Sequence, residues 1–209
     1  MKWFLESCCT SLEEAVYAQS QGARRIELCE CLEVGGVTPS KELLQEVIFA
    51  VKIPVNVLVR PRGGDFYFSE EEILETLEGI RMSAAAGAQG VVIGALDEAG
   101  NVAVDTMRRL ITEARELGLS ITFHRAFDVC ADPLAAFDAI LDLGCDRLLT
   151  SGHEADAYAG RFLIAELVRR ASGRIAVMAG CGVRPSNIDA IASASSAPEY
   201  HASFSFFRA

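Results

Sequence analysis

The sequence predicts an α/β protein that folds as one (β/α)8 barrel, a TIM barrel, in a single domain over residues 1–209. Eight short runs rich in Val, Ile and Leu recur along the chain. Their starts lie roughly 22 to 35 residues apart, which is the length of a strand, a crossover helix and two loops. Polar or reactive residues gather at the ends of nearly all of these runs, as a barrel with its site at the carboxyl ends of its strands requires.

The segment Val55–Asp65, VNVLVRPRGGD, shows the strand pattern most clearly. It opens as a buried strand and ends in two arginines, two glycines and an acid. A strand of this kind places its charges at its carboxyl end, and in a barrel all such ends meet at one mouth. The predicted strands are Trp3–Cys8, Arg25–Cys29, Val55–Arg60, Gly90–Gly94, Ser120–His124, Arg147–Thr150, Ile175–Ala179 and Glu199–Ser203.

Helix boundaries follow the strands in turn. Two starts have a serine three residues before a glutamate, the sequence of a capping box, and three have a proline at the first helical position. Glycines mark the helix ends. The starts are Ser11 with Glu14, Thr38-Pro39, Ser69 with Glu72, Asp132-Pro133 and Arg184-Pro185, and the ends are Gly22, Gly87, Gly118, Gly144 and Gly173.

An open doubly wound sheet is the alternative arrangement of alternating strands and helices. A nucleotide-binding sheet carries GxGxxG after its first strand, whereas this turn reads SCCTSLEE, so we predict the barrel. The sequence ends soon after Ser203, which predicts that the eighth helix is missing. We expect Phe204, Phe206 and Phe207 or a neighbouring subunit to cover the apolar surface left there, and we expect a homo-oligomer.

Composition excludes several classes of protein. Lys and Arg number 19 against 29 Asp and Glu, and the net charge of −10 argues against nucleic acid or an anionic membrane surface as partners. The start MKWFLESCC lacks the apolar core of a signal peptide, and no apolar run approaches the length of a membrane span. Seven cysteines without the spacing of a secreted framework indicate free thiols and a cytoplasmic location.

Side chains two residues apart on a strand share a face, so Glu6 and Cys8 point the same way, as do Glu27 and Cys29. Sequential strands of such a fold are usually neighbours. Two carboxylates and two thiols are therefore predicted to share one corner of the barrel mouth. The other polar candidates at strand ends are Arg60, Arg62, Asp65, His124, Arg125, Asp128, His201 and Ser203.

Structural roles for these residues stay open. Cysteine is among the most buried residue types and often only fills space. Glu6 and Glu27 can be buried ion-pair partners of Arg60 and Arg62 without any chemistry. Cys9, Cys31, Cys130, Cys145 and Cys181 are predicted to be structural, His153 to be solvated, and His124 and His201 to be either core or site residues.

The segments LESCC, RIELC, GGVTPS, RPRGGDF, FHRAFD, LTSG and EYHAS occur in this order along the chain. Together they resemble the CutC family of copper homeostasis proteins, from about Phe4 to Ser203, and RPRGGDF and FHRAFD are the most specific of them. The resemblance implies a (β/α)8 barrel, in agreement with the strand pattern. The chain departs from the family pattern at its end, where SASSAP precedes the last strand and the C-terminal helical segment is absent.

The resemblance implies a role in copper homeostasis, with Cu(I) bound by Cys8 and Cys29 inside the barrel; soft thiolates select this ion. The residues also support an alternative, a lyase or isomerase that acts on a small carboxylated or phosphorylated metabolite. In that case Arg60 and Arg62 would hold the anion. The acid and base candidates would be Glu6, Glu27, His124 and Asp128, with Asp65, Arg125, His201 and Ser203 as further ligand contacts.

Overall fold

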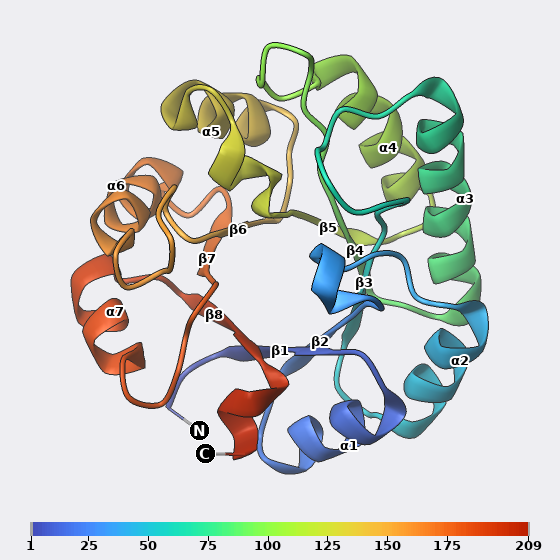
Figure 1. The fold of residues 1–209 in the computed structure, drawn as a ribbon, viewed down its shortest axis with the longest axis horizontal. Coiled ribbons are helices and arrows are strands. Elements are labelled where there is room, and N and C mark those ends of the chain that lie inside the picture. Colours follow the sequence, from blue (N-terminus) through green and yellow to red (C-terminus); the bar gives the residue numbers. More distant parts are fainter. Residues whose placement is uncertain (1, 209) are drawn as a thin grey trace.

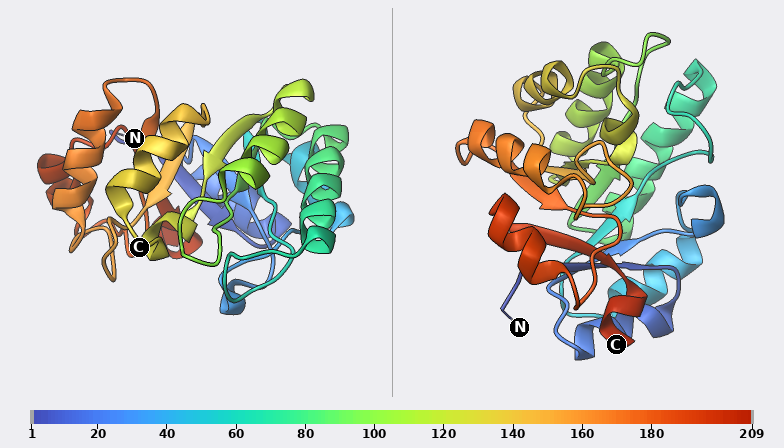
Figure 2. Two further views of the ribbon diagram at one scale, coloured as in Figure 1. Left: turned by 90° about the horizontal axis from the view of Figure 1, so that it is seen from above. Right: turned by 60° about the vertical axis from the view of Figure 1, so that its left-hand side comes forward.

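The computed structural model describes residues 2–208 and confirms the predicted fold class. Eight parallel strands pair in chain order and close into a barrel, because β8 pairs with β1. Figure 1 looks along the barrel and shows the helices as an outer ring, and the turned views of Figure 2 show the same ring from two other sides. None of the helices within residues 2–208 combines the length and apolar composition that a membrane crossing requires.

The strands start close to where the sequence predicts them, and four of the eight end one or two residues earlier than predicted. They are β1 (Leu5–Cys9), β2 (Arg25–Leu28), β3 (Val55–Leu58), β4 (Gly90–Ile93), β5 (Ser120–Phe123), β6 (Arg147–Thr150), β7 (Ala176–Ala179) and β8 (Glu199–Ser203). The α-helices are α1 (Leu12–Ser20), α2 (Lys41–Ala50), α3 (Glu70–Ala86), α4 (Val104–Glu116), α5 (Pro133–Asp142), α6 (Arg161–Ala171) and α7 (Ile188–Ser195). Short 3-10 helices are η1 (Leu32–Val34), η2 (Arg125–Val129) and η3 (Phe204–Arg208).

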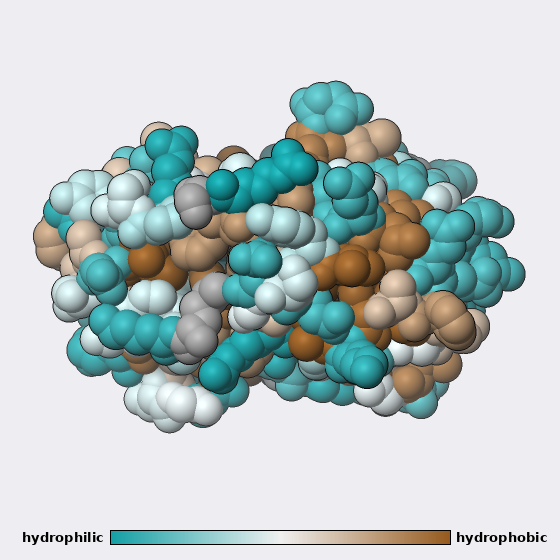
Figure 3. Space-filling model, turned by 90° about the horizontal axis from the view of Figure 1, so that it is seen from below, coloured by the Kyte–Doolittle hydropathy of each residue, from teal (hydrophilic) through white to brown (hydrophobic). Residues whose placement is uncertain are grey.

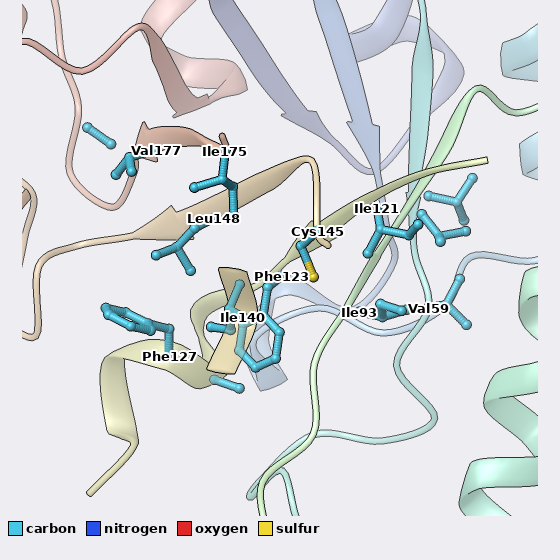
Figure 4. Packing of buried hydrophobic residues seen from close by; sticks show 14 of the residues in the cluster. Val59, Ile93, Ile121, Phe123, Phe127, Ile140, Cys145, Leu148, Ile175 and Val177 are labelled. Atoms are coloured by element: carbon cyan, nitrogen blue, oxygen red, sulfur yellow. The ribbon is translucent and has the colours of Figure 1, made fainter. Parts of the chain in front are cut away.

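Side chains along each strand point alternately to the two faces of the barrel wall, and these faces belong to two separate hydrophobic cores. Residues such as Leu5 and Cys9 of β1 belong to the main core between the strands and the helices. Figure 4 shows part of that core around Phe123 of β5 and Ile140 of α5. The opposite strand faces point into the barrel, and near the mouth they form a small separate cluster. Its members are Cys8, Cys29, Leu58 and Val92.

Three of the predicted helix starts are confirmed by their side-chain hydrogen bonds. Ser69 and Glu72 form the complete capping box at α3, and Asp132 caps α5 by accepting from two backbone N–H groups. Ser11 accepts from the N–H of Glu14 at 3.2 Å. The carboxylate of Glu14 bonds to the N–H of residue 10 instead of to that of Ser11, so this second box is shifted by one residue.

Two of the predicted helix starts lie a few residues before the positions where the helices begin. The hydroxyl of Thr38 accepts from the N–H of Arg60 at 2.9 Å and donates to its carbonyl at 3.1 Å, so Thr38 is not free to cap a helix. Helix α2 therefore begins at Lys41. Helix α7 begins three residues after Pro185, because a turn held by the side chain of Asn187 comes first.

The aromatic residues after β8 cover part of the barrel's outer side, as predicted. They form η3, which lies beside α1 in Figure 2. The ring of Phe204 contacts that of Tyr17 edge to face at 5.5 Å between centroids, and Phe207 is buried. A hydrophobic area remains near the centre of the face in Figure 3. A homo-oligomer that covers exposed apolar surface stays a prediction.

Candidate functional site

A cavity of about 880 Å³ opens at the carboxyl ends of the strands. This is the face where barrels of this type carry their sites. The short helix η1 lies over the opening in Figure 1, and its residues Leu32 and Val34 line the cavity. The predicted site residues that line it are Cys8, Glu27, Cys29, Arg60, His124, Arg125, Asp128, His201 and Ser203.

The two predicted thiols meet in the wall of this cavity. Sγ of Cys8 lies 3.6 Å from Sγ of Cys29, and both side chains are buried. The parallel register explains the contact, because Cys8 pairs with Glu27 and Cys29 follows two residues later on the neighbouring chain segment. The hydrogen bond to Cys29, burial and the charge of Glu27 all raise the pKa of Cys8 well above its ordinary value. Without a cation nearby, Cys8 is a neutral thiol at pH 7.

His201 of β8 lies between the two predicted carboxylates. Its Nδ1 is 2.8 Å from Oε1 of Glu6 and 3.1 Å from Oε2 of Glu27. Burial alone would lower the pKa of His201, but Glu27 and Glu6 outweigh burial and raise it. The sequence prediction of one shared corner is confirmed, and it contains an imidazole in addition.

The two carboxylates of this corner differ in their protonation. Burial would raise the pKa of Glu6, but Arg25 and His201 outweigh burial and lower it to about 2. Burial raises the pKa of Glu27 to about 7, although His201 and Arg25 partly oppose the rise. Two carboxylates whose environments separate their pKa values are typical of acid and base pairs in enzymes. Glu27 is the one that can exchange a proton near neutral pH.

Arg25 is a residue that the sequence analysis missed. Its guanidinium donates to Glu6 and, at 2.5 Å, to Glu199, and Glu199 also pairs with Arg147 at 3.2 Å. The interpretation that Arg60 or Arg62 pairs with Glu6 is therefore wrong. The signal was present in the sequence, since Arg25 lies two residues before Glu27 and shares its strand face.

Arg60 is a buried cation without a carboxylate partner among residues 2–208. Its guanidinium donates to three backbone carbonyls, those of Val34 at 3.2 Å, Gly36 at 3.1 Å and Gly64 at 2.7 Å. It also lies over the ring of Phe66, 4.6 Å from the centroid. Arg60 thus joins two loops of the mouth and leaves an unbalanced positive charge in the cavity wall.

Arg62 and Asp65 are placed differently from the prediction. Arg62 pairs with Asp65 at 3.0 Å and with Glu72 at 2.5 Å, and neither Arg62 nor Asp65 lines the main cavity. Asp65 instead borders a smaller depression beside it. Of Arg60 and Arg62, only Arg60 therefore faces the cavity.

His124 is a neutral imidazole with a defined tautomer. Burial first and the charge of Arg60 second lower its pKa to about 3. Nδ1 accepts a hydrogen bond from the N–H of Ala126 at 3.1 Å, so the ring proton lies on Nε2. Nε2 is buried and has no hydrogen-bond partner among the described residues. His124 is thus a core histidine that also borders the site.

Asp128 holds loops in place. Its carboxylate accepts from Nε of Arg125 at 2.8 Å, from the hydroxyl of Thr150 at 2.5 Å and from the N–H of Ser151 at 2.9 Å. These bonds occupy the oxygens that an acid or base would need. Ser203 is bonded to Ser205 at 2.7 Å between hydroxyl oxygens.

One prediction about a histidine is corrected. His153 is not fully solvated, because it is half-buried and its Nε2 lies 3.2 Å from Sγ of Cys130. The ring also packs edge to face on Phe127 at 5.3 Å between centroids. Cys130 and His153 lie 23 residues apart on different loops, so the local sequence gave no sign of this contact.

The fold and the site together define a (β/α)8 barrel whose mouth carries a buried cluster of thiols, carboxylates and an imidazole. The chain belongs to the CutC family, whose family model matches residues 3–206. A CutC family protein from Parabacteroides distasonis is 47% identical over 204 residues, which cover 97% of this chain and 83% of that protein. The human copper homeostasis protein cutC homolog is 45% identical over 201 residues, covering 96% of this chain and 73% of that protein.

Solved structures agree with this assignment. A CutC structure from Streptococcus agalactiae, described as a copper homeostasis protein, superposes with a TM-score of 0.90 at 28% identity and covers 97% of this chain and 98% of its own. A designated aldolase, QR15, shares the fold alone, with a TM-score of 0.70 at 13% identity, 98% of this chain and 91% of that chain covered.

Proposed function

We propose that this protein handles Cu(I) in the cytoplasm and binds the ion through Cys8 and Cys29. The observation that carries this proposal is the 3.6 Å separation of the two sulfur atoms. Metal–sulfur bonds of about 2.3 Å let two sulfurs at this separation reach one ion together. Thiolates are the soft ligands that select Cu(I) among the common metal ions.

The surroundings of the thiols suit a site whose cysteines stay protonated until a metal ion binds. The raised pKa of Cys8 keeps its proton in place, so metal binding must release it. Cys8 lies in the cavity wall, where an ion can enter from solvent. A reducing cytoplasm keeps such a pair from forming a disulfide, and the family name is consistent with a role in copper homeostasis.

Anaerobic titration of Cu(I) against a competing chelator tests the proposal. The wild type should bind one ion tightly, and the Cys8→Ser/Cys29→Ser double variant should lose this binding. Cys9→Ala is the matched control, because Cys9 is a buried thiol next to Cys8 that belongs to the outer core. If the double variant binds Cu(I) as the wild type does, the thiol pair is not the copper site.

A second function is favoured by the unbalanced charge of Arg60, namely catalysis on a small carboxylated or phosphorylated metabolite. Arg60 would attract the anion to the cavity. Glu27, with its pKa of about 7 and His201 beside it, would take or give a proton. Neutral His124 would border the bound molecule without adding charge. The arrangement suits proton abstraction, as in isomerases and lyases.

Thermal unfolding in the presence of phosphorylated and carboxylated metabolites tests the second function. A true ligand should raise the unfolding temperature of the wild type and not that of Arg60→Met. Arg62→Met is the control, because Arg62 does not line the cavity. A library in which no compound stabilises the wild type would remove the support for this function and leave copper handling unaffected.

A further inference from the structure

We infer that Cys8, Glu27 and His201 form a second metal site, which takes a divalent ion of the zinc type and shares Cys8 with the proposed copper site. One ligand atom from each of the three side chains lies within 4.8 Å of the other two. This site is distinct in its chemistry from the pair of thiols, because it combines sulfur, oxygen and nitrogen donors.

Three adjacent strands hold the donors. Cys8 of β1 pairs directly with Glu27 of β2. On the other side of β1, Cys8 pairs with Ser203 of β8, and His201 lies two residues before Ser203 on the same strand face. Sites built on strands keep their geometry better than sites built on loops. The three donors are thus brought together by the barrel register itself.

The donor set matches the preferences of Zn²⁺. This ion binds cysteine sulfur, histidine nitrogen and carboxylate oxygen, and catalytic zinc sites use three protein ligands with one position left for water or substrate. All three residues line the cavity, so the remaining position is open to it. Glu6 supplies the outer support that metal-bound histidines usually have, since its Oε1 lies 2.8 Å from Nδ1 of His201.

The local charges leave room for a cation. The charge of Glu6 is balanced by Arg25, with which it forms a buried ion pair. The only ion pair of Glu27 within residues 2–208 is the one with His201. A divalent ion at Cys8, Glu27 and His201 would balance the carboxylate and favour release of the thiol proton.

Because both sites need Cys8, we expect the two ions to compete for its thiolate. Cu(I) at Cys8 and Cys29 removes one of the three ligands of the divalent ion. Cu(I) should therefore displace Zn²⁺ or Co²⁺ from the protein in a one-to-one exchange. Of the two metal sites, Cys29 belongs only to the copper site, whereas Glu27 and His201 belong only to the divalent site, so single variants separate the two.

Anaerobic titration of the full chain with Co²⁺, monitored by absorption, tests the site directly. The wild type should bind one Co²⁺ and show a sulfur-to-cobalt charge-transfer band, which Zn²⁺ and Cu(I) each abolish. Glu27→Gln and His201→Gln should weaken Co²⁺ binding at least about tenfold, which is the scale of losing even an outer-sphere partner. Both variants should still bind one Cu(I), because Cys8 and Cys29 remain in place.

Two further variants complete the test. Cys29→Ser should lose Cu(I) and keep Co²⁺ with its charge-transfer band, and Cys9→Ala should keep both ions. Absence of the band in the wild type overturns the inference without any variant, so poor folding of Glu27→Gln or His201→Gln does not protect it. Unchanged Co²⁺ binding by folded Glu27→Gln overturns it as well. Failure of the wild type to bind Cu(I), with Co²⁺ still bound, would instead contradict the copper proposal and leave the divalent site in place.

Discussion

Replacement of Arg25 by methionine is expected to destabilise the barrel by about 3 to 5 kcal/mol at pH 7, the usual cost of breaking a buried ion pair from one side. Arg25 is buried and donates to the carboxylates of Glu6 and Glu199. Methionine keeps much of the side-chain volume but removes the charge. Glu6, which has no solvent exposure, would then retain a negative charge with only His201 nearby.

The lowered pKa of Glu6 points in the same direction. Arg25 and His201 outweigh the effect of burial and lower this pKa from 4.5 to about 2 in the folded protein. The ionised form of Glu6 therefore contributes to stability. Since the folded-state pKa is the lower one, this contribution is present above pH 4.5 and is lost as the pH falls from 4.5 towards 2.

Urea denaturation of the metal-free protein measures the effect. For a chain of this length, the expected loss corresponds to a fall of about 6 to 20 °C in the unfolding temperature. Arg24→Met is the control, because Arg24 is the exposed neighbour. The gap between Arg25→Met and wild type should narrow below pH 4.5. A loss under about 1 kcal/mol at pH 7, or one equal to that of Arg24→Met, would refute the assigned role of Arg25.

Three further predictions concern stability. The pKa of His124 is lowered from 6.5 to about 3, so its contribution should be lost as the pH falls through this range, at up to about 1.4 kcal/mol per pH unit. His124→Asn, which can still accept from the N–H of residue 126, should flatten that part of the stability–pH curve, and an unchanged curve would contradict the pKa assignment. Ser69→Ala should lose about 1 kcal/mol in urea denaturation with the capping box of α3, and a loss near zero would show that the box contributes nothing. Gly90→Ala should destabilise the protein more than Gly118→Ala does, because the added Cβ at Gly90 would lie 2.2 Å from Oγ and 2.8 Å from the carbonyl oxygen of Ser120. At Gly118 the cost is only that of a left-handed backbone, φ +76°, with nothing within 4 Å of the Cβ, and equal unfolding temperatures would contradict the prediction.

The sequence was sufficient to predict the barrel, because strand spacing and side-chain alternation are properties of the local chain. The corner of Glu6, Cys8, Glu27 and Cys29 followed from the same alternation and from the neighbouring positions of sequential strands. The exact helix starts did not follow. Thr38 has the sequence of an N-cap, but its hydroxyl bonds to the backbone of Arg60 in the loop after β3, and a contact of that kind has no local signal.

The partners of charged residues were harder to predict than their positions. Arg60 and Arg62 are two residues apart, yet one is buried against carbonyl groups and the other pairs with Asp65 and Glu72. The bend after β3 separates their directions, so strand alternation no longer applies. Glu6 forms an ion pair with Arg25 because β1 and β2 are paired, which places Glu6 directly opposite Arg25. The register that fixes this pair is a tertiary property and is not written in either strand alone.

The two proposed metal sites share Cys8, but each proposed site also contains residues that the others lack. Substitution of those residues therefore separates the proposed functions. Under these proposals Cys29 would serve Cu(I) binding alone, because it is not among the donors of the divalent site. Arg60 would serve anion binding alone, because its guanidinium contacts carbonyl groups and no thiol or carboxylate. Glu27 would serve both the divalent site and proton transfer. A process that fails in Glu27→Gln and persists in Cys29→Ser therefore depends on the carboxylate, and copper binding by the thiol pair would not explain it.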